Sequence, residues 1–229
     1  MNEKNHIFAK IKAKKIMKQY FLSFYLLLTT SSIAVVFNSY SRDEPEKENP
    51  KTTDAGVVIN DVRWATRNVD MPGIFAENLE SLGMFYQWGR NIAWSADVNA
   101  DVSDWNNSFY TGDTWTRAND PCPQGWRVPT DAELQTLTDT NYVTSEWTTV
   151  NDVSGRIFTD INTNISLFLP AAGFRSQSNG SLNRVGTWGC YWSSTVSGAN
   201  ARHLGFGSGG VTVGTGYRAW GFSVRCVAE

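Results

Sequence analysis

Residues 186–227, GTWGCYWSSTVSGANARHLGFGSGGVTVGTGYRAWGFSVRCV, alternate aromatic, glycine and small polar residues without any helical periodicity. The alternation is clearest at 201–206, 210–213 and 221–227. Successive side chains of a β-strand point to opposite faces of the sheet. Each of the three pieces therefore predicts a strand with one face in the core and one face exposed.

The two predicted faces differ in size and polarity. The core face is large and apolar and contains Leu204, Phe206, Val211, Val213, Phe222, Val224 and Cys226. The other face is small or polar and contains His203, Gly205, Thr212, Ser223 and Arg225. Arg202 departs from this division, because strict alternation places it on the face of Leu204. We interpret the exposed face as a binding surface and the remaining chain as its scaffold.

The overall composition is that of one domain preceded by a tail. The 229 residues include ten Trp, eight Tyr and twelve Phe, which is typical of a core filled with large rings and of contact surfaces. Residues 1–40 hold six of the 20 basic residues and one of the 22 acidic residues, so the rest of the chain is net acidic. Because no basic patch is present that could follow a phosphate backbone, nucleic acid is not an expected partner.

An export signal is expected at residues 1–40, where a lysine-rich start precedes the apolar run 20–37. A signal peptide is the favoured interpretation. A retained membrane leader is the alternative, because the run approaches the ~20 residues that span a bilayer. Residues 41–55 are charged and free of large apolar side chains, which predicts a disordered tether. The folded domain is then 56–229.

The junction between leader and tether resembles that of Bacteroidota surface lipoproteins, in which a lipid-bearing cysteine precedes Ser and acidic residues. Tyr40 stands where that cysteine is expected, and the link to the lipid needs its sulfur. The resemblance implies export to the outer-membrane surface or into the medium, with any membrane association made through the leader.

Short strands are expected on both sides of a long polar loop. They lie at 57–60, 62–66, 84–88, 147–150, 156–158 and 167–169. The loop, 89–121, carries Trp94, Trp105 and Trp115. We expect these tryptophans to pin the loop to the core rather than to bind a ligand.

A single helix is expected after the loop. Thr130 is a good N-cap and Glu133 follows three residues later, which is the capping-box pattern. The helix then runs to about Leu137 with Leu134 and Leu137 on one face. Because Glu133 has this structural role, we do not assign it a catalytic one.

No calcium site is expected in the acidic stretch 97–104, although oxygen-bearing side chains occupy alternate positions there. An EF-hand loop requires Gly at its sixth position and Glu at its twelfth. This chain has Val102 and Ser108 at those positions. A solvated acidic loop is the better interpretation.

Other metal and catalytic patterns are also missing from the sequence. The three cysteines lack the paired short spacing of a zinc site, and the two histidines, His6 and His203, cannot complete one. Neither a Ser-His-Asp set nor a phosphate-binding loop is recognisable. We therefore expect no cofactor and no enzymatic activity.

Six motifs occur in order from Gly56 to the C-terminus: GVVINDVRWATRNVD, GMFYQWGR, DPCPQGWRVPTDAEL, FLPAAGFR, YWSST and GFSVRCV. Together they resemble the Fibrobacter succinogenes major paralogous domain, found in exported proteins of Bacteroidota and their relatives. The resemblance covers nearly all of the chain after the tether. It implies an α+β, C-type lectin-like fold, with a twisted antiparallel sheet, one or two helices and long loops.

The same resemblance implies that the two ends of the domain meet and that a disulfide joins Cys122 to Cys226. A bridge that closes so long a loop contributes ~3–5 kcal/mol in the loop-entropy description. Cys190 is then the odd thiol, and we expect it to behave as a small buried hydrophobe.

The C-terminal pattern is also similar to the variable region of proteins diversified by retroelements, in which outward side chains differ between copies of a fixed scaffold. Carried over to this sequence, the fixed positions are Ala201, Leu204, Phe206, Gly221, Phe222, Val224 and Cys226. The exposed positions include Arg202, His203, Gly205, Gly207, Thr212, Tyr217 and Trp220. Many of these are glycines, so a shallow site is expected. Its predicted ligand-binding residues are Trp188, Arg202, His203, Thr212, Tyr217 and Trp220.

These residue types favour an exported module that binds a protein or a glycan, as a monomer or within a surface assembly. Calcium is not expected to take part, because the Glu-Pro-Asn and Gln-Pro-Asp tripeptides of calcium-dependent lectins are absent. A structural adhesin or pilus-associated subunit is the alternative, with an apolar patch around Trp188 and Trp220 buried in an assembly. An enzyme related to formylglycine-generating proteins is a third, less favoured reading, because its reactive cysteine pair is here assigned to a structural bridge.

Overall fold

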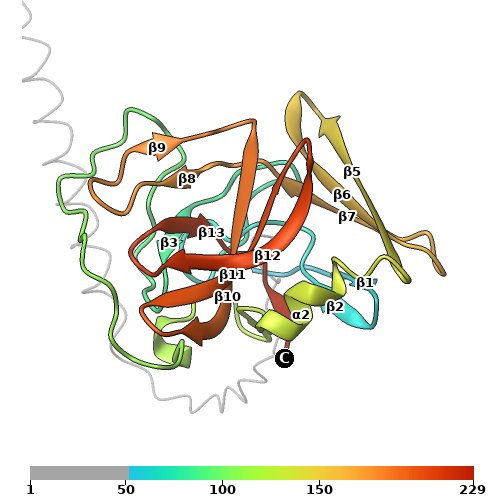
Figure 1. The fold of residues 1–229 in the computed structure, drawn as a ribbon, viewed down its shortest axis with the longest axis horizontal. Coiled ribbons are helices and arrows are strands. Elements are labelled where there is room, and N and C mark those ends of the chain that lie inside the picture. Colours follow the sequence, from blue (N-terminus) through green and yellow to red (C-terminus); the bar gives the residue numbers. More distant parts are fainter. Residues whose placement is uncertain (1–51) are drawn as a thin grey trace, which may run out of the picture. The chain divides into compact units, whose positions relative to one another are not determined.

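A computed structural model describes residues 52–229 of the chain, which form mostly antiparallel strands with very little helix (Figure 1). The predicted leader, 1–40, and the tether up to Lys51 lie outside the described residues. No helix among residues 52–229 is long and apolar enough to cross a membrane.

The ordered contacts begin at the end of the predicted tether. The Asp54 carboxylate accepts hydrogen bonds from the backbone N–H groups of Gly56 (2.8 Å) and Thr66 (3.0 Å). It also pairs with Arg67 Nε at 3.2 Å, and its side chain is only 2% exposed. The fold therefore includes Asp54, two residues before the predicted start of the domain.

The two ends of the fold meet in one small sheet with the strand order β1-β2-β14-β4. Its strands are β1 (Val57–Ile59), β2 (Val62–Trp64), β14 (Val227–Ala228) and β4 (Trp126–Arg127). The β1–β2 turn holds Asn60 and Asp61 in the left-handed region, as a two-residue hairpin requires. Val227 pairs with Trp64, which confirms that the ends of the domain meet.

The main sheet has the strand order β12-β11-β10-β13-β8-β9, with β3 also paired to β13. In chain order the strands are β3 (Phe85–Gln87), β8 (Phe174–Arg175), β9 (Leu182–Asn183), β10 (Trp188–Ser197), β11 (Asn200–Gly207), β12 (Gly210–Tyr217) and β13 (Gly221–Ser223). All neighbours are antiparallel except β10 and β13. The long central strand β10 was not among the predicted strands, because its first half, WGCYWSS, is apolar on both faces.

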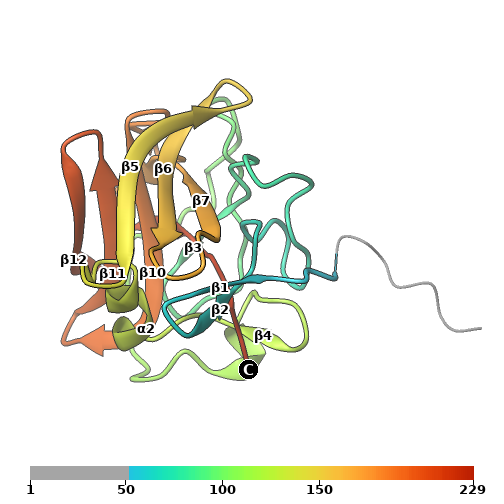
Figure 2. The same cartoon turned by 90° about the vertical axis from the view of Figure 1, so that its right-hand side faces the viewer.

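A third sheet covers one face of the β10–β11 hairpin (Figure 2). It consists of β5 (Val143–Val150), β6 (Val153–Asp160) and β7 (Ser166–Pro170), which contain and extend the predicted strands. Phe158 packs against Phe206 with ring centroids 6.2 Å apart. We call the apolar layer between these sheets the hairpin core; its members include Phe158, Leu167, Tyr191, Leu204 and Phe206.

The only α-helix among the described residues is α2 (Asp131–Thr136), and Arg117–Asn119 adds one 3₁₀ turn, η1. The predicted capping box is confirmed: the Thr130 side chain accepts from the Glu133 backbone, and the Glu133 carboxylate accepts from the Thr130 N–H at 2.7 Å. The helix covers little more than one turn. The expected α+β class is therefore corrected to mostly antiparallel β, because the apolar helical pattern contains only Leu134 and Leu137.

The last strand segment also differs from expectation. Residues 221–227 do not form one continuous strand, because β13 ends at Ser223. Ser223 and Arg225 were predicted to be exposed but are buried, with 0% and 1% of their surface accessible. The apolar side chains of this segment pack into a second apolar layer, which we call the disulfide core. Its members include Trp88, Trp126, Trp192, Phe222 and Cys226. β13 lies between β10 and β8 in the sheet, and all three of its residues are buried, so both of its faces are covered.

Candidate functional site

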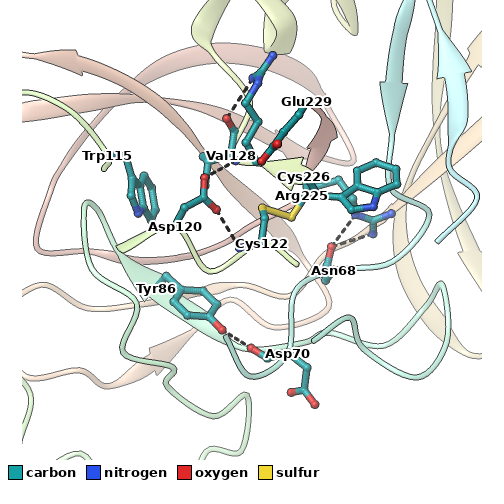
Figure 3. Close-up of a disulfide and its surroundings, with 12 residues drawn as sticks. Asn68, Asp70, Tyr86, Trp115, Asp120, Cys122, Val128, Arg225, Cys226 and Glu229 are labelled. Carbon is teal, nitrogen blue, oxygen red and sulfur yellow. Dashed lines mark hydrogen bonds between the residues drawn. A yellow bond between two sulfur atoms is a disulfide. The ribbon is translucent and has the colours of Figure 1, made fainter. Parts of the chain in front are cut away.

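The scaffold of the C-terminal region is closed by a disulfide between Cys122 and Cys226, with their Cα atoms 6.0 Å apart (Figure 3). The pairing implied by the family resemblance is thereby confirmed. Asp120 fixes the approach to this bridge, because its carboxylate accepts from the N–H groups of Cys122 (2.8 Å) and Val128 (3.0 Å). Burial raises the pKa of Asp120 above its ordinary value. The bridge ties the segment before α2 to the end of the chain.

Arg225 forms the second link of this scaffold. Its Nε and Nη2 donate to the Asn68 side-chain oxygen at 3.0 and 2.7 Å, and its Nη1 donates to the Ala65 carbonyl at 3.2 Å (Figure 3). Asn68 in turn donates to the Leu82 carbonyl at 2.9 Å. Burial lowers the pKa of Arg225 to about 10. The guanidinium therefore connects the last strand segment to the chain after β2 and has no surface to offer a ligand.

The β11–β12 hairpin shows the predicted division into two faces. Leu204 pairs with Val213 and Phe206 with Val211, and all four contribute to the hairpin core. The opposite face carries the pairs His203–Gly214 and Gly205–Thr212. Only this second face is open, and we call it the open face.

A hollow of about 230 Å³ lies on the open face. Its lining residues are Phe174, Cys190, His203, Thr215, Gly216, Trp220 and Phe222. The ring centroids of Phe174 and Trp220 are 4.9 Å apart, as are those of His203 and Phe222. No charged side chain lines the hollow, so it offers aromatic surface to an uncharged group.

Glycines keep the approach to the hollow open. A Cβ atom added at Gly214 would lie 3.6 Å from His203 Cε1, an ordinary contact distance, so a small side chain fits there. A Cβ atom at Gly216 would lie only 2.9 Å from Phe222 Cε2, so this position holds glycine because the Phe222 ring approaches it closely. The expected shallow, glycine-rich surface is thus present on the open face.

His203 is neutral in this setting. Burial lowers its pKa to about 4, with the neighbouring charge of Arg202 as a smaller cause. Its Nδ1 atom is buried without a hydrogen-bond partner among the described residues. Its ring packs against the neighbouring rings of Trp192 and Phe222, at centroid distances of 6.0 and 4.9 Å. At neutral pH the imidazole therefore contributes an uncharged aromatic wall.

The six predicted ligand-binding residues are not gathered in one place. Only His203 and Trp220 line the hollow. Thr212 lies beside it on the open face, as does Trp188, whose ring would contact a Cβ atom at Gly205 at 3.8 Å. The side chains of the remaining two, Arg202 and Tyr217, contact residues outside the hollow.

Arg202 lies on the face of Leu204, where strict alternation places it. Its Nε donates to Asp131 Oδ1 at 2.8 Å, at the start of α2. Tyr217 stands at the end of β12 and packs edge-on against Phe109, with centroids 5.4 Å apart. The exposed assignment carried over from the variable-region pattern therefore does not describe Arg202, which holds the helix onto the hairpin.

Sequence reasoning missed Phe174 and assigned Phe222 to the core alone. Phe222 follows the core alternation of its strand, and only the neighbouring Gly216 opens its ring edge to the hollow. Phe174 comes from β8, about thirty residues before His203, and no short-range pattern links the two. Pairing of β8 with β13 brings Phe174 to the site.

The long loop 89–121 is held in place as predicted, by tryptophans. Trp94 and Trp105 pack with centroids 4.9 Å apart, and Trp105 Nε1 donates to the Gln177 carbonyl at 3.0 Å. Trp115 packs on Trp88 at 5.6 Å. These contacts confirm a structural role for the three loop tryptophans.

Two buried arginines also hold the loop 89–121 in place, and this role was not predicted from the sequence. Arg175 Nη2 donates to the carbonyls of Ser95 (2.6 Å) and Asp97 (2.9 Å). Arg218 Nη1 donates to the carbonyls of Tyr110 (3.0 Å) and Gly112 (2.8 Å). The planar guanidinium suits this task because its several donors are fixed in one fork.

The acidic stretch 97–104 uses its carboxylates on its own backbone. Asp97 accepts from the Asn99 N–H and Asp101 from the Ser103 N–H, each at 2.8 Å. Within residues 52–229, no group of three or more His, Cys, Asp or Glu side chains is arranged to hold a metal ion.

Cys190 is the free cysteine of the described residues and is buried. Burial raises the pKa of its thiol to about 12. The sulfur is therefore protonated at neutral pH, which weakens it as a nucleophile. Its burial agrees with the expected role as a small hydrophobe.

A profile of the Fibrobacter succinogenes major domain matches residues 57–228, which is nearly the whole of the described fold. Neither the curated proteins nor the solved structures contain a significant match to the chain.

Proposed function

This chain belongs to the Fibrobacter succinogenes major domain family, and on that premise we propose that it is an exported or cell-surface ligand-binding module. It recognises a protein or a glycan through the open face of the β11–β12 hairpin, without calcium. The observation that carries the proposal is the uncharged aromatic hollow formed by Phe174, His203, Trp220 and Phe222. Aromatic side chains at a water-accessible, rigid site are the groups that most often carry binding energy.

The scaffold supports this proposal because it is rigid where the site is open. The Cys122–Cys226 bridge and the buried Arg225 tie the C-terminal region to earlier parts of the chain, and neither lines the hollow. Such a bridge is typical of proteins in oxidising compartments, which supports export. We also propose that the fold is C-type lectin-like, since its two ends pair in one sheet and the bridge joins the helix approach to the last strand.

A structural adhesin or pilus-associated subunit is the second candidate. Trp188 and Trp220 are both half-buried and belong to the same open face, where an assembly partner could cover them. An enzymatic role is not proposed. Cys122 and Cys226 are bonded to each other and the pKa of Cys190 is raised, so none of the three resembles an activated cysteine.

Binding of the full chain to arrays of glycans and of bacterial and host proteins tests the proposal. The site variant is His203→Ala with Trp220→Ala, and Tyr142→Ala is the control, because Tyr142 is an exposed aromatic residue outside the hollow. We expect the site variant to lose binding that the control retains. A folded site variant that binds as the parent does would show that the hollow is not the site. Native mass measurement distinguishes a monomeric binder from an assembly subunit.

A further inference from the structure

β12 is an edge strand. Among residues 52–229 it pairs with β11 alone, and Figure 2 shows it as the outermost strand on its side of the molecule. The two strands are joined by a two-residue turn, which makes Gly207 and Gly210 a hydrogen-bonded pair. Hydrogen-bonded and non-bonded pairs then alternate along the hairpin. Val211, Val213 and Thr215 therefore direct their backbone N–H and C=O groups away from β11.

This edge lacks the features that usually protect a free strand from pairing. Its sequence, GVTVGTGY, contains no charged residue and no proline. Its register against β11 is continuous from Gly210 to Tyr217, without a bulge. Edge strands are normally protected by lysine, proline or a bulge, so β12 is competent to accept another strand.

Glycines also connect this edge to the hollow. On the open face β12 carries only Gly210, Thr212, Gly214 and Gly216. A strand added outside β12 lies about 4.8 Å from it. A large side chain of that strand can cross Gly214, which has no side chain, and reach the rings of His203 and Trp220.

We propose that β12 accepts an extended peptide segment of another protein as an additional strand. One uncharged aromatic or large aliphatic side chain of that peptide crosses Gly214 and fills the hollow. Main-chain hydrogen bonds to Val213 and Thr215 supply affinity, and the hollow supplies selectivity, as in other cases of strand addition. This inference rests on the proposed function and specifies a peptide as the ligand.

A second copy of this chain does not fit the same site. Paired through the same edge, the copy would place its own open-face residues beside those of the first molecule. Those residues are Gly210, Thr212, Gly214 and Gly216, none of which can fill the hollow. The uncharged lining likewise disfavours a charged side chain, whose desolvation would be uncompensated.

The test uses the full chain and two N-acetylated, C-amidated heptapeptides, Thr-Val-Thr-Phe-Thr-Val-Thr and the same sequence with Gly in place of Phe. Calorimetry or fluorescence anisotropy measures binding. We expect the Phe peptide to bind about tenfold or more tightly than the Gly peptide, because only Phe can fill the hollow. Equal affinity of the two peptides, or no detectable binding of the Phe peptide, would overturn the inference.

Two pairs of variants separate the backbone and side-chain contributions. Thr215→Pro removes an N–H that points away from β11, so the ladder with β11 is kept, and Tyr142→Ala is its control because Tyr142 lies outside both β12 and the hollow. Gly214→Val blocks the crossing point where a Cβ atom has room, and Gly209→Val makes the same change at the open hairpin tip. We expect Thr215→Pro and Gly214→Val each to weaken binding of the Phe peptide about tenfold, and the two controls to leave it within about twofold.

The remaining outcomes are also decisive. If array binding is lost in the His203→Ala, Trp220→Ala variant but unchanged by Thr215→Pro, a ligand occupies the hollow without strand addition, and the proposed function stands while this inference fails. A neutral glycan that binds in this manner would be such a ligand. If the free chain is a dimer that Thr215→Pro dissociates, the edge is occupied by a second copy, which also overturns the inference.

Discussion

Two segments of the C-terminal region alternate in the same way in sequence and end in opposite environments. In the β11–β12 hairpin, one face packs into the hairpin core and the other stays open around His203 and Thr212. In residues 221–227, both faces are buried, including Ser223 and Arg225. Alternation therefore identifies two faces, but the neighbours of a strand decide whether the second face meets water. The residues packed over each face make the difference: β12 keeps exposed residues such as Thr212 on one face, whereas all three residues of β13 are buried.

We call residues 221–227, whose two faces are both buried, the closed segment. The disulfide is expected to be the interaction that stabilises this segment most. It joins residues separated by 104 positions, so the loop-entropy description predicts a contribution of about 4.7 kcal/mol. Replacing both Cys122 and Cys226 with Ala should lower the free energy of unfolding by that amount in denaturant titrations. Cys190→Ala serves as the control for loss of one buried sulfur. A loss no larger than that of the control would mean that the bridge does not hold the closed segment.

Arg225 tests directly whether the closed segment has an exposed face. Arg225→Met removes a buried guanidinium and leaves the Asn68 oxygen and the Ala65 carbonyl without these donors. We expect a loss of about 3 kcal/mol in the free energy of unfolding. The control Arg184→Met changes an exposed arginine that contacts the ring of Trp188, and it should cost under about 1 kcal/mol. Equal effects would remove the distinction between the two segments.

On the open face, His203 is expected to make the free energy of unfolding depend on pH. Its folded pKa of about 4 lies below the ordinary value of 6.5, so between those pH values the unfolded chain binds more protons than the fold. Stability contributed by the neutral imidazole should be complete above pH 6.5 and decline as pH falls towards 4, by up to about 3 kcal/mol.

The measurement is the difference in unfolding free energy between the parent and His203→Gln across this pH window. Glutamine cannot titrate, so the difference isolates His203 from carboxylates such as Glu133, whose pKa is lowered. A difference that does not change between pH 4 and 6.5 would contradict the burial of the His203 ring.

Thr212 gives the smallest expected effect. It is exposed on the open face, and its side chain makes no hydrogen bond among the interactions of the described residues. Thr212→Ala should change the free energy of unfolding by under about 0.5 kcal/mol. Thermal unfolding monitored by circular dichroism is sufficient to check this. A loss approaching that of Arg225→Met would show that the open face is covered.

Local patterns in the sequence were sufficient for most of the framework. The β1–β2 hairpin, the Thr130–Glu133 capping box and the alternation of β11 and β12 all depend on residues within a few positions of one another. The bridge between Cys122 and Cys226 needed the family resemblance, since spacing alone cannot pair three cysteines. The predicted helix existed but remained short, because Leu134 and Leu137 provide little apolar surface.

The candidate site was predicted in part. His203, Trp220 and Thr212 do belong to the open face, as the alternation and the variable-region pattern suggested, and so does Trp188, which was predicted only as an additional contact residue. Arg202 was assigned to the same surface but pairs with Asp131 on the other side. The binding role of all these residues remains a proposal that the array experiment tests.

The arginines show what sequence could not provide. After Lys51 every basic residue is Arg, and the sequence does not say which of them are inside. In the fold, Arg175, Arg218 and Arg225 are buried and donate to backbone carbonyls or an amide oxygen of distant segments. These acceptors are separated from their arginines by up to 160 positions, so no short-range pattern contains them.

The sequence by itself determined that residues 186–227 alternate between apolar and small or polar positions, because the period of two is a property of neighbouring residues. It also determined that glycine occupies several of the exposed positions, and hence that any surface they form is shallow. Only the tertiary structure decided which alternating segment is open, because strand order and the covering β5–β7 sheet depend on contacts between distant residues. For the same reason, only the fold brought Phe174 beside His203 and Trp220 and left the edge of β12 free beside the hollow.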